Sequence, residues 1–197
     1  MKKILLSVLT MGSLMSVQGA LVQYSVTLDG LSESPVNASP GFGSGTVNYD
    51  NVTHSLQIQV SFSGLTGTTT ASHIHAGTAA PFAGTAGVAT TTPYFAGFPI
   101  GVSSGSYSTT LDLTLASSWN GAYITANGGT TSGAETALGT AMADGKAYWN
   151  IHSTTFGGGE IRGFLVPVPE PSTIALAGLG TLGIAGSAWN RRRINKS

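Results

Sequence analysis

The chain has 197 residues, charged residues make up only 8% of it, and it contains no cysteine. A typical soluble protein is about 25% charged, so this composition excludes coiled coils and polybasic nucleic-acid binders. The lack of cysteine excludes disulfides, thiolate nucleophiles and cysteine-ligated zinc. Between Ala20 and Pro167 there are seven acidic and two basic residues, which gives a formal charge of −5. This segment therefore lacks the positive charge that binds the phosphates of nucleic acid.

The first 19 residues have the pattern of a secretory signal peptide. Lys2 and Lys3 give a positive start, residues 4–17 are apolar, and residues 17–19 form a small-residue cleavage site. We therefore predict that signal peptidase removes residues 1–19 and that the rest of the chain crosses the inner membrane.

Residues 20–166 are predicted to form one all-β domain. Apolar and polar residues alternate with period two along six segments, separated by Gly-rich and Asn-rich turns. These segments are residues 21–29, 45–49, 55–62, 107–115, 146–152 and 160–166. Short strands at this spacing favour an antiparallel β-sandwich or barrel of about seven to nine strands.

Two further stretches of this domain differ from the strand pattern. Residues 133–143 are predicted to form a short helix. Residues 77–105 are rich in Gly, Thr and Pro and predict a long loop with one strand at 86–90. Tyr94, Phe95 and Phe98 in this loop are candidates for exposed aromatic rings that stack on sugars.

Three histidines form a candidate metal site. His73 and His75 are two residues apart on a predicted strand, so both imidazoles leave the same face. His152 completes a cluster if its strand is a neighbour, and such a cluster suits Cu or Zn. Glu160 is a fourth ligand or an acceptor that orients an imidazole. The alternative is that the histidines are half-buried polar groups and that Glu160 forms a structural ion pair with Arg162.

The same motifs resemble the CHRD (chordin-type) domain over about residues 22–166. The resemblance rests on the His-x-His-x-Gly segment at residues 73–77, the His152 segment and the Gly-Glu-Ile-Arg-Gly segment at residues 159–163. In the family Thr usually follows the last histidine, whereas Ser153 and Thr154 follow it here. The resemblance implies an extracellular β-sandwich, but the family's biochemical role is poorly defined.

Residues 167–197 resemble the PEP-CTERM sorting signal of Gram-negative bacteria. Pro169, Glu170 and Pro171 are followed by an uncharged stretch at residues 174–189 and then by Arg191, Arg192 and Arg193. Sixteen helical residues span about 24 Å, a marginal transmembrane helix, and the arginines would stay cytoplasmic. The resemblance implies that the chain is exported across the inner membrane, transiently anchored there and processed by an exosortase, and that the protein then reaches the cell surface or the extracellular matrix. The alternative is a plain C-terminal membrane anchor.

We therefore predict an exported surface or matrix protein that acts as a non-enzymatic module and binds exopolysaccharide or other surface proteins. The alternative is a metal-binding exported protein that uses the three histidines and Cu or Zn. No catalytic constellation supports an enzyme, because the sequence has neither a Gly-x-Ser-x-Gly elbow nor an evident carboxylate pair.

Overall fold

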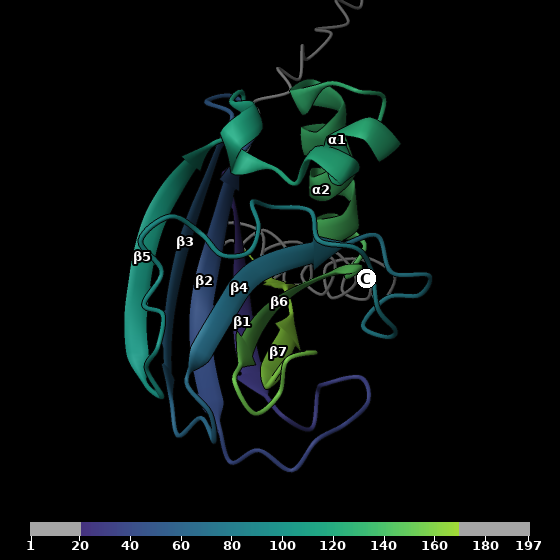
Figure 1. Ribbon diagram of the computed structural model, residues 1–197. Helices are drawn as coiled ribbons and strands as arrows, with labels where there is room; N and C mark the ends of the chain where they lie inside the picture. Colours follow the sequence, from purple (N-terminus) through teal and green to yellow (C-terminus); the bar gives the residue numbers. More distant parts are fainter. Residues whose placement is uncertain (1–20, 170–197) are drawn as a thin grey trace, which may run out of the picture.

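A computed structural model describes residues 21–169, which form one eight-stranded antiparallel sheet in the order β4-β6-β7-β1-β2-β3-β5, with β8 paired to β1. The sheet curls so that β4 and β6 lie across from β2, β3 and β5 (Figure 1). The predicted all-β antiparallel fold is confirmed as a curled half-barrel. The strands are Leu21–Asp29 (β1), Phe42–Asp50 (β2), Ser55–Ser63 (β3), Thr69–Ala76 (β4), Gly105–Asp112 (β5), Ala147–Ser153 (β6), Ile161–Phe164 (β7) and Val166–Pro167 (β8).

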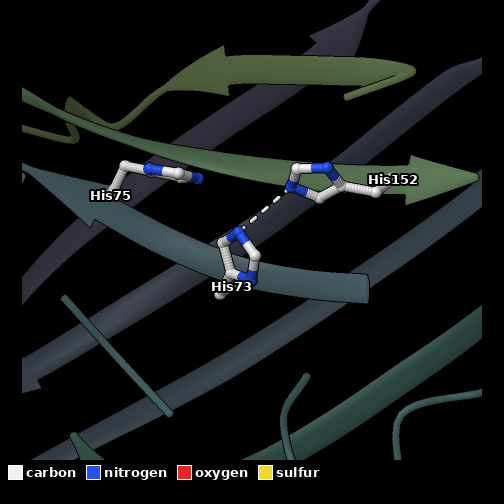
Figure 2. A group of neighbouring side chains, drawn as sticks. All are labelled: His73, His75 and His152. Carbon is white, nitrogen blue, oxygen red and sulfur yellow. Dashed lines mark hydrogen bonds between the residues drawn. The ribbon is translucent and has the colours of Figure 1, made fainter. Parts of the chain in front are cut away.

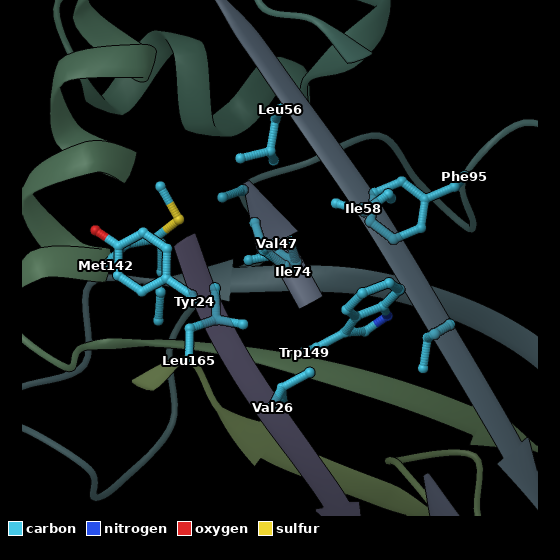
Figure 3. Packing of buried hydrophobic residues seen from close by; sticks show 14 of the residues in the cluster. Tyr24, Val26, Val47, Leu56, Ile58, Ile74, Phe95, Met142, Trp149 and Leu165 are labelled. Carbon is cyan, nitrogen blue, oxygen red and sulfur yellow. The ribbon is translucent and has the colours of Figure 1, made fainter. Parts of the chain in front are cut away.

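The core fills the inside of the curl. Alternate residues of each strand point inward, so Ile74 of β4 and Trp149 of β6 face Val26 of β1 and Ile58 of β3 (Figure 3). All four side chains are buried, and the Phe95 ring packs edge-on against Trp149. The outer faces of β4 and β6 carry polar residues instead, and the histidines lie there.

A short segment links the two free edges of the sheet, β4 and β5. Thr69 at the start of β4 donates its N–H to Val102 O (2.8 Å) and accepts from Gly101 N–H (2.9 Å). Its hydroxyl also donates to Pro99 O at 2.7 Å. The segment before β5 therefore closes the curl with hydrogen bonds rather than with a further strand.

Helices lie over one end of the curl (Figure 1). The predicted helix is present as α2, Thr131–Ala143, which begins at an N-cap where the Thr130 side chain accepts from Gly133 N–H. A second helix, α1, Gly121–Ala126, was not predicted; at six residues it is too short to show a helical period, although Asn120 caps it. A 3₁₀ turn, Ala116–Ser118, precedes it.

The prediction that a strand continues to residue 115 is wrong, because β5 ends at Asp112. The Asp112 carboxylate accepts from both the N–H and the hydroxyl of Thr114 (2.9 and 2.6 Å), which turns the chain out of the sheet.

The long loop between β4 and β5 is confirmed, but two details of it are corrected. The strand predicted at residues 86–90 is reduced to isolated bridges from Val88 to His75 and from Thr90 to Trp119. Phe95 and Phe98 are buried core residues, and only Tyr94 is exposed. The aromatic rings therefore anchor the loop to the core and are not a sugar-stacking platform.

Within residues 21–169, no helix has the length and apolar character needed to cross a membrane. The predicted signal peptide at residues 1–19, the C-terminal helix at residues 174–189 and the residues Glu170, Pro171, Arg191, Arg192 and Arg193 lie outside the described residues. Pro169 is the last residue described.

Candidate metal centre

Strand pairing brings the three predicted histidines together. β4 and β6 are antiparallel neighbours, with His73 opposite Asn150, His75 opposite Tyr148 and Ala71 opposite His152. His152 is thus the diagonal neighbour of His73 on the outer face of the sheet. His73 is buried, and the other two histidines are half-buried.

The three imidazoles point toward one another (Figure 2). The Nε2 atoms of His73 and His152 are 3.0 Å apart, and one nitrogen from each of the three rings lies within 4.8 Å of the others. Nitrogen atoms bound to one ion at about 2.0–2.1 Å are roughly 3.3–3.5 Å apart. The nitrogen–nitrogen distances of the cluster, from 3.0 Å up to at most 4.8 Å, therefore include the spacing expected around one metal ion.

Backbone carbonyls hold the opposite nitrogen of every ring. Nδ1 of His73 donates to Pro93 O (3.0 Å) and Nδ1 of His75 donates to Ala86 O (2.8 Å), both in the long loop. Nδ1 of His152 donates to Gly157 O (2.9 Å) in the turn after β6. Because a carbonyl can only accept, each bond fixes the proton on Nδ1 and leaves Nε2 as a bare lone pair.

The resulting arrangement is unfavourable without a positive charge between the rings. The two Nε2 lone pairs of His73 and His152 face each other at 3.0 Å, and the buried Nε2 of His75 has no hydrogen-bond partner. A buried acceptor without a partner costs about 1–3 kcal/mol. A cation among the three nitrogens would satisfy all of them at once.

A proton is poorly suited to that role, because burial disfavours charged imidazole here. Burial, and then the neighbouring rings, lower the pKa of His73 to about 4. Burial likewise lowers the pKa of His75 to about 4, and it lowers the pKa of His152. At neutral pH all three rings are neutral ligands with free lone pairs.

A stack of side chains supports the site from the side of β7. The His75 ring lies parallel to Tyr148, with centroids 4.6 Å apart, and the Arg162 guanidinium lies 4.7 Å from the Tyr148 centroid. Arg162 is itself buried, donates to the carbonyls of Ser32 and Gly84, and pairs with Glu33 at 3.8 Å. A fixed positive charge is therefore separated from His75 by the Tyr148 ring.

The structure does not bring Glu160 to the histidines. Its buried carboxylate accepts from the Ser39 hydroxyl (2.6 Å) and from the N–H groups of Thr66 and Gly67. These bonds fix the turn before β4. The predicted ion pair between Glu160 and Arg162 is absent, since Arg162 pairs with Glu33 instead.

Sequence reasoning missed Glu33 and the side-chain role of Asn150. Both are buried, and Glu33 Oε1 and Asn150 Oδ1 have no hydrogen-bond partner. A Cβ added to Gly159 would come within 2.7 Å of both atoms, so only glycine leaves them room. Both side chains lie beside Gly159 although Glu33 and Asn150 are far apart in the sequence, so no local pattern predicts this arrangement.

Comparison with known families agrees with this geometry. Residues 24–165 match the CHRD domain, which covers all three histidines and the whole curled sheet up to β7. The chain belongs to the CHRD domain family. Residues 167–193 match the PEP-CTERM protein-sorting motif, directly after the CHRD domain. No curated protein and no solved structure matches the chain.

The sorting motif indicates where the protein is located. A PEP-CTERM signal implies export, processing by exosortase, and a cell-surface or extracellular location in a Gram-negative bacterium. The CHRD domain is therefore the part of the protein that works outside the cell.

Proposed function

We propose that the exported CHRD domain binds a transition-metal ion, copper or zinc, through His73, His75 and His152. The observation that carries this proposal is the orientation of the rings: every Nδ1 donates to a backbone carbonyl, so three bare Nε2 lone pairs converge on one point. Imidazole is a common ligand for both metals. The role is a non-enzymatic binding module.

In this proposal residues 1–19 are removed as the signal peptide, and residues 174–189 anchor the chain in the membrane until exosortase acts. The metal site then reaches the cell surface or the matrix with the CHRD domain. The hydropathy and the basic cluster of the tail support the transient anchor.

The test is elemental analysis of the full chain, expressed with export and purified. We expect about one copper or zinc ion per chain in the wild type and only background metal in the double variant His73→Ala/His75→Ala. His54→Ala is the matched control, because His54 is outside the cluster and pairs with Glu135 at 2.9 Å. This control should keep the full metal content.

A folded wild-type protein that cannot be loaded with either metal would overturn the proposal. Far-UV circular dichroism of each variant shows whether it is folded, so metal loss is separated from unfolding.

A further inference from the structure

The ligands of the candidate site are all electrically neutral. Within residues 21–169, the group able to hold an ion consists of His73, His75 and His152, with no carboxylate among them. The sequence contains no cysteine to add a thiolate. The nearest predicted acidic ligand, Glu160, is occupied by the turn before β4. No ligand of this site would therefore neutralise any of the positive charge of a bound metal ion.

The surroundings add positive rather than negative charge. Arg162 lies over Tyr148, which stacks on His75, and Arg162 is buried, so water screens its charge weakly. Its partner Glu33 has a pKa raised by burial to about 7, so near neutral pH its carboxyl is only partly ionised. The positive field of Arg162 at the site is thus incompletely cancelled.

Both facts favour an ion of low charge. The cost of moving an ion out of water grows with the square of its charge, and no anionic ligand offsets that cost here. Zn²⁺ usually takes four ligands in a tetrahedron, and Cu²⁺ prefers a square or tetragonal set. Three histidine nitrogens would leave the fourth position of Zn²⁺ to water and would leave Cu²⁺ short of a tetragonal set, whereas they can form a complete trigonal set for Cu⁺.

We propose that the three-histidine site selects Cu⁺ over Cu²⁺. This inference rests on the proposed function and adds the oxidation state of the bound metal. At the cell surface, the domain would keep copper in the reduced form, and oxidation of the bound ion, with loss of one electron to an acceptor such as dioxygen, would weaken its binding.

The experiment measures two dissociation constants on the purified full chain at pH 8. Cu⁺ affinity is obtained by competition with bicinchoninate under argon with ascorbate, and Cu²⁺ affinity by competition with glycine in air. We expect Cu⁺ to bind at least 100-fold more tightly than Cu²⁺. Equal or tighter binding of Cu²⁺ would overturn the selectivity while leaving metal binding intact. Failure to bind either copper ion, together with failure to load zinc, would instead remove the proposed function.

Two variants test the physical cause. Glu33→Gln removes the anion that partly cancels Arg162, so the affinity ratio should shift several-fold further toward Cu⁺ at pH 8. Glu135→Gln, which removes an acidic group paired with His54 outside the cluster, is the matched control and should leave the ratio unchanged. An unchanged or reversed ratio in Glu33→Gln would contradict the electrostatic argument.

Discussion

Glu33 lies in an environment that a carboxyl group does not favour. It is a buried carboxyl 3.8 Å from Arg162, with one oxygen lacking a partner beside the equally unpartnered Asn150 Oδ1. Burial, opposed by Arg162, raises the pKa to about 7 from a usual value of 4.5.

Because the folded-state pKa is raised, the folded domain holds this proton more tightly than the unfolded chain. Its contribution to stability is therefore fully present below about pH 4.5, and it is lost as pH rises through the folded-state pKa of about 7. Glu33→Gln, which cannot ionise, should flatten this slope and stabilise the protein at pH 8 by up to about 3 kcal/mol. Urea unfolding at pH 5 and pH 8 measures the effect. A variant less stable than wild type at both values would show that the carboxylate is needed as an anion.

At the scale of elements, the histidine site depends on a strand pair and on two loops that cover it. β4 and β6 supply the rings, while the loop between β4 and β5 and the turn at residues 154–160 supply the carbonyls that orient them. The two strands and the two loops therefore have to be folded together before the Nε2 lone pairs of the three histidines point toward one another.

Metal binding should consequently stiffen these loops. We expect slower amide hydrogen exchange in residues 77–104 and 154–160 when the protein is saturated with copper or zinc, because the bound rings hold the carbonyls. Exchange in β3, which lies away from the cluster, should not change. No added protection of these loops would show that they are already fixed without metal, and equal protection of β3 would show that the ion stabilises the whole domain rather than the loops.

The sequence predicts the structure best where the period-two alternation of apolar and polar residues, or a single motif, is enough to identify an element. The alternation in residues 21–29 and 55–62 predicts β1 and β3, and the same rule correctly places His73 and His75 on one face. The prediction of a three-histidine cluster assumed that the strands of His73 and His152 are neighbours. The sequence could not establish this, because strand order follows from long-range packing. The burial of Phe95, the pairing of Arg162 with Glu33, and the turn set by Asp112 all depend on tertiary contacts.

At the scale of the whole molecule, the fold is a sheet that curls without completing a barrel. Its two edges meet through Thr69, whose hydroxyl donates to Pro99 O and accepts from Val102 N–H (3.3 Å). This buried side chain therefore adds two hydrogen bonds to the backbone bonds that link the opposite ends of the strand order.

Thr69→Val keeps the shape of the side chain and removes both side-chain hydrogen bonds. We expect a loss of about 1–3 kcal/mol in the free energy of unfolding, because Pro99 O and Val102 N–H lose their partner. Urea unfolding of the exported protein measures it, with Thr110→Val on the exposed face of β5 as control. Equal stability of the two variants would mean that the edges are held by backbone bonds alone.

The last strand, β8, also belongs to the sorting motif. Pro167 and Val166 pair with Tyr24 and Ser25 of β1, and Val168 N–H donates to Gln23 O at 2.8 Å, whereas the PEP-CTERM match begins at residue 167. Pro167 is therefore shared by the sheet and the sorting motif, and no linker separates the two. An exosortase that bound residues 167–169 would have to detach them from β1 first, and the rate of release from the membrane would then depend on how firmly the domain holds its own final strand.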